Sequence, residues 1–537
     1  MDNLELFKIL LKNYEYGKNK DKNKNENYIS PKEMNIVDNN CEYLGISKIV
    51  LMENAGKCLS DEIINYLNKN INNKQNVKHK IYVFCGLGNN GGDGFVAVRH
   101  LMGHWDDTKS PLCMELNIIL LGKENEIKTY ESKENFKILK NICELDNRLK
   151  IKEAPCPYEI LNIIEDIKKE MEKYPVIIID GMIGTGIKGN LREPFKTVVN
   201  ELNKLKNETP TNNNGKNDSL KIISIDTETN GLNADMVITF HKYKPNTDTT
   251  KTILKKIGIP PIAEHIVGWG DLKALTKINP NSHKGNNGKV LVVGGSKEFF
   301  GAPILSALAS SKIVDLVTIA SVNNTIDALK NYPELMGYEI EGNYFGEEHI
   351  YEIMELSKKY DVVVLGNGLS VNKNTKKFVN GFLEEMGKLN KKIVIDADAI
   401  KVIDYTNFDF RENYIFTPHK KEFEYMGIGI CNDNLDMRMD ISNISSTIVL
   451  KGRYDLIFNK NNIKINKTGN VGMTSGGTGD VLCGIIGGLF SKNDAFISSC
   501  CGAFINGYAG DLLLKEKGRY YNPIDIIDKI PNVLSMF

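Results

Sequence analysis

The chain has 537 residues, of which 41% are hydrophobic and 25% charged, as is typical of a globular protein with more than one domain. Lysine plus arginine equals aspartate plus glutamate at 68 each, so the charge balance gives no support for a nucleic-acid or membrane-surface partner. The 10 cysteines include no C-x-x-C pair, and no apolar run approaches the roughly 20 residues that span a bilayer. We therefore expect a protein of the reducing cytoplasm, without a zinc site, a disulfide framework or a membrane span.

The first 27 residues differ from the rest in composition. Leu4–Leu11 has the apolar content of a short helix, whereas Lys18–Glu26 contains no apolar residue. We interpret residues 1–27 as a polar, flexible extension. Directly after it, Ser30-Pro-Lys-Glu33 has the capping-box pattern with which helices begin.

Four apolar runs follow, separated by amphipathic helical stretches, and they predict buried parallel strands. The runs are Ile81–Phe84, Leu116–Leu121, Val176–Ile179 and Ile222–Ile225. This alternation predicts an α/β domain over residues 28–250.

A glycine-rich loop, Gly86-Leu-Gly-Asn-Asn-Gly-Gly-Asp93, follows the first run and satisfies G-x-G-x-x-G. A dinucleotide fold for hydride transfer also needs an acidic residue at the end of the next strand, to hold the ribose. That strand ends here at Leu121-Gly-Lys123, which disfavours hydride transfer. Because Asn89, Asn90 and Asp93 add polar side chains, the loop can hold a phosphate by its backbone and position a ligand or cation beside it.

Residues 251–280 are spotted with proline and lack a strong strand pattern, so we interpret them as a linker region. Five further apolar runs then predict a second α/β domain over residues 281–537. These runs are Val290–Val293, Leu316–Ile319, Val362–Leu365, Ile393–Ile395 and Thr447–Leu450.

The most informative motif of the second domain is Thr474-Ser-Gly-Gly-Thr-Gly-Asp-Val-Leu482, a glycine-rich turn before an apolar run that predicts a buried helix. Free N–H groups at a helix start bind anions, and the helix dipole favours the charge of Asp480 there. An anion site beside a carboxylate is what phosphoryl transfer from a nucleotide requires. A tight turn capped by Asp480 is the structural alternative.

The two domains resemble two known enzyme families. The first resembles the NAD(P)H-hydrate epimerases in Leu51–Gly56, Gly88–Gly94 with Arg99, Asp180–Gly186, Asp226 and Ala234–Phe240. The second resembles the ADP/ATP-dependent NAD(P)H-hydrate dehydratases in His283–Gly285, Gly301–Pro303, Pro333-Glu334, Gly366–Leu369, Asp396–Ala399, Thr417–Glu422, Leu450–Gly452 and Gly476–Leu482. The resemblance covers residues 28–537. It implies an α/β protein, with an N-terminal Rossmann-like three-layer domain followed by a C-terminal ribokinase-like α/β domain.

The resemblance implies a bifunctional enzyme of nicotinamide nucleotide repair. Hydration of NADH or NADPH at the nicotinamide ring gives R and S hydrates that cannot donate hydride. The dehydratase half would restore the S form at the expense of ADP or ATP with Mg²⁺, and the epimerase half, with K⁺, would interconvert R and S. Fused members tend to use ADP, but no residue of the sequence decides between the two nucleotides. Such proteins often form homo-oligomers.

For the dehydratase, Asp480 would be the general base that takes the proton of the added hydroxyl as it attacks the terminal phosphate. The resemblance assigns the nucleotide site to Lys451, Gly452, Arg453, Tyr454, Asp455, Gly476, Gly477, Thr478 and Gly479. It assigns contacts with the hydrate to Ala302, Gly368 and His419. His419 could instead cap a helix that begins near Lys420. One of Asp396 and Asp398 would orient Mg²⁺ through water, or both would cap the next helix.

For the epimerase, Asp226 ends a predicted strand and would be the acid/base carboxylate; a turn-capping role is the alternative. The resemblance assigns substrate contacts to Asn89, Asn90, Gly91, Gly92, Asp93, Gly184, Thr185, Gly186, Ile187, Lys188, Gly189 and Asn190. It assigns K⁺ binding to Asn90, Asp180 and Thr229.

The sequence departs from the family at two places. After the aspartate the family continues Ile-Pro-Ser-Gly, whereas this chain has Asp226-Thr-Glu-Thr-Asn-Gly231, so Thr229 or Asn230 would replace the serine as a K⁺ ligand. The missing proline leaves this loop freer. Asn367 stands between two glycines where the family often has proline, and we expect it to be tolerated.

Two other functions fit parts of the sequence. The C-terminal domain could be a ribokinase-type small-molecule kinase, which uses a similar aspartate and anion site. The N-terminal domain could be a non-catalytic binding module, and the altered loop after Asp226 favours this alternative.

Overall fold

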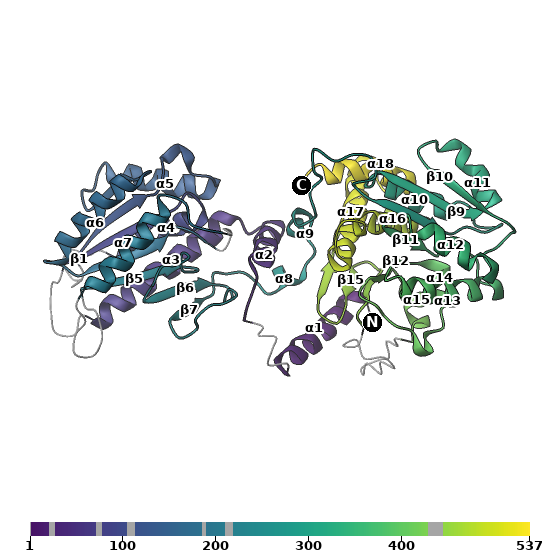
Figure 1. The fold of residues 1–537 in the computed structure, drawn as a ribbon, viewed down its shortest axis with the longest axis horizontal. Helices are drawn as coiled ribbons and strands as arrows, with labels where there is room; N and C mark the ends of the chain where they lie inside the picture. Colours follow the sequence, from purple (N-terminus) through teal and green to yellow (C-terminus); the bar gives the residue numbers. More distant parts are fainter. Residues whose placement is uncertain are drawn as a thin grey trace. The chain divides into compact units, whose positions relative to one another are not determined.

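The computed structural model describes residues 2–20, 27–70, 78–104, 113–184, 189–209, 219–427 and 444–537. The chain divides into two compact units (Figure 1). The N-terminal unit is Asn25–Pro260, and the C-terminal unit combines Met1–Lys24 with Pro261–Phe537.

The N-terminal unit is built on a parallel sheet of seven strands in the order β3-β2-β1-β4-β5-β6-β7. The strands are β1 (Lys78–Cys85), β2 (Cys113–Leu120), β3 (Leu149–Glu153), β4 (Val176–Gly181), β5 (Leu220–Ile225), β6 (Met236–Phe240) and β7 (Thr252–Lys255). The helices are α2 (Pro31–Tyr43), α3 (Lys48–Asn70), α4 (Asn89–Gly103), α5 (Tyr130–Cys143), α6 (Pro157–Met171) and α7 (Phe195–Glu208). The capping box predicted at Ser30 and Glu33 is present at the start of α2.

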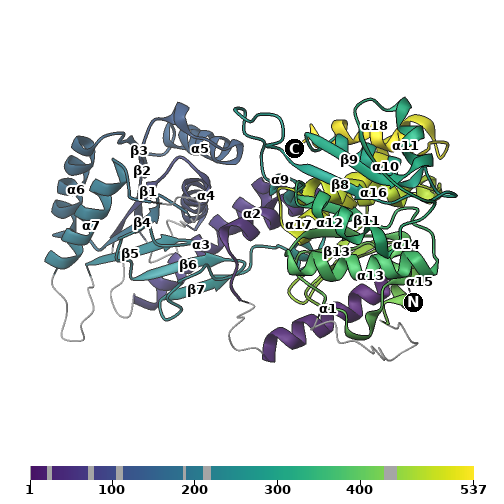
Figure 2. The same cartoon turned by 45° about the vertical axis from the view of Figure 1, so that its right-hand side comes forward.

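Helices cover both faces of this sheet, which makes three layers (Figure 2). Tyr82 and Phe84 of β1 share a buried cluster with residues of α6 and α7. On the other face, a Cβ at Gly94 of α4 would lie 3.1 Å from Val83. The alternation of successive strand side chains therefore places one helix layer on each face.

All four strands predicted for the first domain are present, as β1, β2, β4 and β5. The strands β3, β6 and β7, which lie towards the two edges of the sheet, are not predicted by the apolar runs. β3 alternates buried Leu149 with exposed lysines, so it lacks a continuous apolar run. β7 lies inside the segment 251–280 that we had interpreted as a linker, and its residues are mostly half-buried.

Over its described residues, the C-terminal unit contains a sheet of nine strands in the order β10-β9-β8-β11-β12-β13-β14-β15-β16, parallel from β10 to β14 and antiparallel beyond. The strands are β8 (Lys289–Val293), β9 (Leu316–Val322), β10 (Met336–Ile340), β11 (Val362–Leu365), β12 (Lys392–Ile395), β13 (Tyr414–Phe416), β14 (Thr447–Leu450), β15 (Asp455–Phe458) and β16 (Ile463–Asn466). The helices are α1 (Asn3–Lys20), α8 (Ile262–His265), α9 (Trp269–Lys273), α10 (Ala302–Ser311), α11 (Asn323–Ala328), α12 (Ile350–Ser357), α13 (Lys373–Lys388), α14 (Ala397–Val402), α15 (Lys420–Tyr425), α16 (Thr478–Phe490), α17 (Ala495–Lys517) and α18 (Pro523–Leu534).

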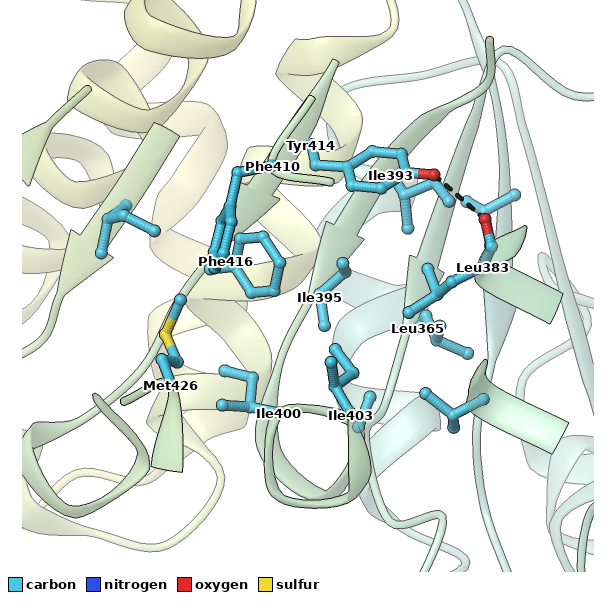
Figure 3. Packing of buried hydrophobic residues seen from close by; sticks show 14 of the residues in the cluster. Leu365, Leu383, Ile393, Ile395, Ile400, Ile403, Phe410, Tyr414, Phe416 and Met426 are labelled. Carbon is cyan, nitrogen blue, oxygen red and sulfur yellow. Dashed lines mark hydrogen bonds between the residues drawn. The ribbon is translucent and has the colours of Figure 1, made fainter. Parts of the chain in front are cut away.

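The five strands predicted for the second domain are β8, β9, β11, β12 and β14. The strands β10, β15 and β16, which lie towards the two edges, and the short interior strand β13 were not predicted. The core beside these strands is aliphatic and aromatic (Figure 3). In it, Phe410 packs against Phe416, and the Tyr414 hydroxyl donates a hydrogen bond to the carbonyl of Leu383 at 3.2 Å. Both sheets confirm the α/β class predicted from the sequence.

The start of the chain differs from the polar, flexible extension that we expected over residues 1–27. Residues 3–20 form α1, and Leu6, Phe7 and Leu10 are buried in the core of the C-terminal unit. Their spacing of one and three residues puts the three side chains on one face of the helix. The burial of this apolar face holds α1 against the C-terminal unit. The lysines and asparagines further along the sequence gave no sign of it.

Candidate active sites

The glycine-rich turn of the second domain lies directly before α16, and Asp480 is in the first turn of that helix. Gly477 has φ 96°, a left-handed conformation that favours glycine, and a Cβ there would come 2.6 Å from Leu305. Ser306 of α10 donates to the carbonyl of Asp480 at 2.8 Å. The turn and the aspartate are therefore held in place by the packing of α10 against α16.

Asp480 belongs to a network of four side chains. The Nδ2 of Asn367 donates to Oδ1 of Asp480 at 2.6 Å and to Oδ2 of Asp396 at 3.2 Å. Lys451 Nζ donates to Oδ1 of Asp396 at 2.8 Å. Because β11, β12 and β14 all end at the same edge of the sheet, residues 367, 396 and 451 meet there.

Burial raises the pKa of Asp480 to about 7, and the charge of Asp396 adds to the rise, while the hydrogen bond from Asn367 opposes it. Burial lowers the pKa of Lys451, but the charges of Asp396 and Glu422 outweigh burial and raise it above its ordinary value. Asp480 can thus accept a proton near neutral pH beside a lysine that stays charged.

The residues predicted to bind the nucleotide come from two segments that meet. Lys451–Tyr454 connects β14 to β15, and Lys451 Nζ lies 3.5 Å from the position of a Cβ at Gly479. Within the connection, the Gly452 N–H donates to Oδ1 of Asp455 at 3.1 Å. Burial raises the pKa of Asp455 to about 6, against hydrogen bonds from Asn466 and Gly452.

Of the three residues predicted to contact the hydrate, two are neighbours. Gly368 has φ 70°, and a Cβ there would lie 3.4 Å from that of Ala302 and 2.4 Å from the carbonyl of Phe299. His419 is half exposed and caps α15, because its Nδ1 accepts from the N–H of Glu422 at 3.2 Å. The Lys451 N–H donates to the carbonyl of Pro418 at 2.8 Å, so His419 lies next to the nucleotide connection.

The two aspartates after β12 have different surroundings. Asp396 precedes α14, but its carboxylate makes no cap hydrogen bond and instead contacts Asn367 and Lys451. Asp398 accepts from the N–H of Ser370 at 2.9 Å and pairs with Lys401 at 3.0 Å. Only Asp396 is joined directly to the network of Asp480.

In the N-terminal unit, Asp226 follows β5 and has φ 62°, a strained conformation for a residue with a side chain. Its Oδ1 accepts from the Thr239 hydroxyl at 3.0 Å and pairs with Lys244 Nζ at 2.7 Å. The Lys244 side chain is 3% exposed, and that of Asp226 is 15% exposed. A positive charge therefore holds this carboxylate at the carboxyl edge of the sheet.

The loop after β1 is tightly packed against the end of β4. A Cβ at Gly86 would come 1.8 Å from the carbonyl of Met182, and one at Gly91 would come 2.1 Å from the carbonyl of Gly86. Asn90 Nδ2 donates to the carbonyl of Ile225 at 3.1 Å. The loop thus reaches the end of β5, where Asp226 lies.

Only some of the residues predicted to contact the epimerase substrate lie close to one another. A Cβ at Gly184 would lie 2.7 Å from Oδ1 of Asn90, whereas Asn89, Gly189 and Asn190 are exposed. Thr185, Gly186, Ile187 and Lys188 lie outside the described residues. Gly92 and Asp93 are buried, and burial raises the pKa of Asp93 well above its ordinary value, with the charges of Asp226 and Asp38 adding to the rise.

Asp180 and Thr229, two of the predicted K⁺ ligands, are hydrogen-bonded. Asp180 is 1% exposed, and it accepts from the hydroxyl of Thr229 at 2.7 Å, the N–H of Thr229 at 3.0 Å and the hydroxyl of Ser224 at 2.7 Å. Asn90, the third, has its carbonyl 3.0 Å from the position of a Cβ at Gly181. The donor set is a buried carboxylate with hydroxyl and amide oxygens, which fits a hard monovalent cation.

Sequence reasoning missed Lys244 and treated Asn367 only as a tolerated substitution. The signal for Lys244 was weak, since a lysine four residues after Phe240 gives no sign of burial in the sequence. Groups of three or more His, Cys, Asp or Glu able to hold a metal are absent from the described residues. None of the helices described is both long and apolar enough to cross a bilayer.

Comparison with known proteins matches both halves of the chain to known families. Residues 48–246 match the family model described as YjeF-related protein N-terminus, and residues 290–532 match the model described as NAD(P)H-hydrate dehydratase. The chain is 56% identical over 536 residues to the bifunctional NAD(P)H-hydrate repair enzyme Nnr of Methanocaldococcus jannaschii, covering 100% of this chain and 98% of that protein. It is 33% identical to the Methanothermobacter thermautotrophicus protein of the same name, covering 94% of this chain and 95% of that one.

A solved structure of ADP/ATP-dependent NAD(P)H-hydrate dehydratase from Bacillus subtilis, co-crystallised with ATP and Mg²⁺, is also similar. It is 23% identical with a TM-score of 0.42, and the match covers 49% of this chain and 95% of that one.

The two units define a bifunctional α/β enzyme, with a YjeF-related N-terminal domain and a C-terminal NAD(P)H-hydrate dehydratase domain. The chain belongs to the family of bifunctional NAD(P)H-hydrate repair enzymes.

Proposed function

We propose that this chain epimerises the R and S hydrates of NADH and NADPH and dehydrates the S form with a nucleotide. The observation that carries the proposal is the network of Asp480, Asn367, Asp396 and Lys451 at the glycine-rich start of α16. Family membership supports the pair of activities. The roles of individual residues follow from the chemistry of the two sites.

In the dehydratase site, Asp480 takes the proton of the added hydroxyl while that oxygen attacks the terminal phosphorus of the nucleotide. The bond between the terminal phosphorus and the bridging oxygen breaks. ADP is thereby converted to AMP, or ATP to ADP. The phosphorylated hydroxyl then departs as phosphate, a far better leaving group than hydroxide, the neighbouring ring carbon loses a proton, and the ring recovers its double bond. General base catalysis of this kind contributes about 10²–10⁴-fold.

The groups around Asp480 suit that reaction. The Gly476–Gly479 turn presents N–H groups at the start of α16, which neutralise charge on the transferred phosphoryl group. Lys451 is held by Asp396 beside Gly479, where its positive charge can act on the nucleotide. Ala302 and Gly368 form the neighbouring wall, which would contact the hydrate.

Asp396 would provide the carboxylate oxygens that Mg²⁺ prefers. It would be a better ligand than Asp398, directly or through water, because it does not cap α14 and Asp398 is bonded to Ser370 and Lys401. When bound, Mg²⁺ neutralises phosphate charge. Lys451 and Asn367 orient the carboxylate of Asp396.

In the epimerase site, Asp226 acts as the acid and base that transfers the proton needed to invert the hydroxylated ring carbon. Its ion pair with Lys244 fixes the direction of its carboxylate. Asn90, Asp180 and Thr229 would hold K⁺, which supplies positive charge beside the substrate phosphate when bound. Thr229 is preferred to Asn230, because Thr229 is buried against Asp180 and Asn230 is exposed.

We also propose a cytoplasmic location, which the chain's thiols support. The eight cysteines whose side chains are described are all free, as expected in a reducing compartment.

The test supplies an R/S mixture of NADH hydrate with Mg²⁺, K⁺ and either ADP or ATP. Recovery of NADH absorbance with one free phosphate per NADH supports the dehydratase, and the faster nucleotide identifies the phosphoryl donor. A phosphorylated product that persists without NADH recovery would instead identify a ribokinase-type kinase.

A further inference from the structure

The N-terminal helix α1 plays no part in the function proposed above. It precedes the N-terminal unit in the sequence but belongs to the C-terminal unit in space. Its buried face, Leu6, Phe7 and Leu10, packs in the core that also contains residues of β15 and β16. Phe7 additionally meets the ring of His265 edge to face, with 6.5 Å between ring centroids. The helix is therefore docked on the strand that follows the nucleotide connection.

The first residue of α1 reaches that connection directly. Nδ2 of Asn3 donates to the carbonyl of Leu450 at 2.9 Å and to the carbonyl of Tyr454 at 2.8 Å. An amide nitrogen has two hydrogens, so these two bonds use both of them. Leu450 ends β14 and Tyr454 precedes β15, which means that one side chain joins the two ends of the connection.

The fit around Asn3 is close. A Cβ at Gly452 would come 2.6 Å from Nδ2 of Asn3, so a larger residue at 452 would displace the amide. On its other side, the connection is held by Arg453, whose Nη1 donates to the carbonyl of Gly469 at 3.0 Å. Asn3 is thus one of the groups that fix the shape of a short connection in which Gly452 and Arg453 are exposed.

We propose that α1 is a working part of the dehydratase half, and that Asn3 is a positioning residue that holds Lys451–Tyr454 in the shape that binds the nucleotide. The inference rests on the nucleotide-binding role proposed for this connection. With its ends joined by Asn3, the connection loses less freedom on binding, and Lys451 stays directed at Asp396 and the start of α16. Without Asn3, each binding event must order the connection again.

The test compares Asn3→Ala and Asn3→Asp in the full chain with Lys8→Ala, an exposed position on the same helix. Titration calorimetry gives the Kd of ADP and of ATP, and the repair assay gives the KM of nucleotide and of hydrate. We expect Asn3→Ala to raise the Kd and KM of the nucleotide about 3- to 10-fold, from the loss of two neutral hydrogen bonds. Asn3→Asp should raise them further, because its oxygens face two carbonyl oxygens. The KM of the hydrate and the epimerase rate should not change.

Hydrogen exchange of the amides in 451–454, measured without nucleotide, separates positioning from general destabilisation. Faster exchange confined to this connection in both Asn3 variants, with the wild-type rate in Lys8→Ala, is the expected result. An unchanged nucleotide Kd in both Asn3 variants, while the wild type binds, overturns the inference alone. If the wild-type chain binds neither nucleotide, the proposed function fails and this inference fails with it.

Discussion

The amide of Asn367 donates a 2.6 Å hydrogen bond to Asp480, and the same nitrogen reaches Asp396 at 3.2 Å. The Oδ1 of Asn367 is buried and has no hydrogen-bond partner among the described residues, so the two carboxylates alone orient this amide. A proline at this position could form neither bond. The departure from the family pattern at residue 367 therefore gives this chain a direct link between the proposed base and its acidic neighbour.

Replacing Asn367 with alanine should make the dehydratase more sensitive to acid. Asp480 acts as a base when deprotonated, so the rate should rise with pH through its pKa of about 7. The Asn367 hydrogen bond lowers that pKa, so its loss raises the pKa and moves the acid limb of the profile to higher pH. At pH 7 we expect kcat to fall about 5- to 10-fold and to recover at alkaline pH.

The measurement is a pH profile of NADH recovery from the S hydrate, with the exposed Asn374→Ala as the matched control. A kcat that drops equally at every pH in Asn367→Ala would contradict a role in setting the protonation of Asp480.

Thr229→Val should raise the K⁺ concentration that the epimerase requires, whereas Asn230→Ala should leave that concentration unchanged. The Thr229 hydroxyl donates to Asp180 at 2.7 Å inside the buried donor set, and valine keeps the shape but removes the oxygen. The rate of epimerisation is measured at increasing K⁺ concentration, with Na⁺ replaced by K⁺ so that the ionic strength stays constant. If Asn230→Ala, rather than Thr229→Val, raises the K⁺ requirement, the assignment of the ligand is wrong.

Lys244→Met should impair the N-terminal unit while leaving the dehydratase intact. Lys244 is almost fully buried and pairs with Asp226 at 2.7 Å, so methionine leaves a largely buried carboxylate without its counter-charge. Breaking such a pair costs about 3–5 kcal/mol of stability. Urea unfolding and the epimerase rate are compared with those of the exposed control Lys196→Met. Wild-type stability together with wild-type epimerisation would show that the pair is unimportant.

Asp38→Asn should stabilise the N-terminal unit at alkaline pH. Burial raises the pKa of Asp38 from 3.8 to about 6 in the folded state, with Lys48 opposing and Asp226 adding to the rise. A raised carboxyl pKa means that the folded state holds the proton more tightly, so stability falls as pH rises from about 4 to about 6 and stays lower above. Asparagine avoids this loss, so we expect a gain of about 1–3 kcal/mol at pH 8 and little gain near pH 4. Urea unfolding at both pH values tests the sign; a gain at pH 4 alone would refute it.

The sequence was most informative where a local pattern determines the geometry. Glycines 476, 477 and 479 before an apolar run predicted both α16 and the place of Asp480, because helix starts are specified by neighbouring residues. Most buried strands were predicted for the same reason, but the short interior strands β6 and β13 were not. Edge strands such as β3 and β7 were missed, since their outer sides need no apolar residues.

Contacts between residues far apart in the chain could not be predicted from local patterns. Asn367 is 113 residues from Asp480, and Asn3 is 451 residues from Tyr454, so no pattern joins either pair. The lysines and asparagines that follow α1 also outweighed its single apolar face in our interpretation of the segment. The long-range contacts of Asn367 and Asn3 form only when the folded chain brings distant segments together.

The measurement that tests the central claim most directly starts from the pure R hydrate of NADH, because its repair requires both sites in turn. R and S hydrates and NADH are separated by chromatography over time, with Mg²⁺, K⁺ and nucleotide present. We predict that the wild-type chain converts R through S to NADH well above the spontaneous rate, that Asp480→Asn stops at an R/S mixture, and that Asp226→Ala leaves R to epimerise only spontaneously. NADH formation from R at the wild-type rate in Asp226→Ala would contradict the account, since the N-terminal unit would then not be a catalyst.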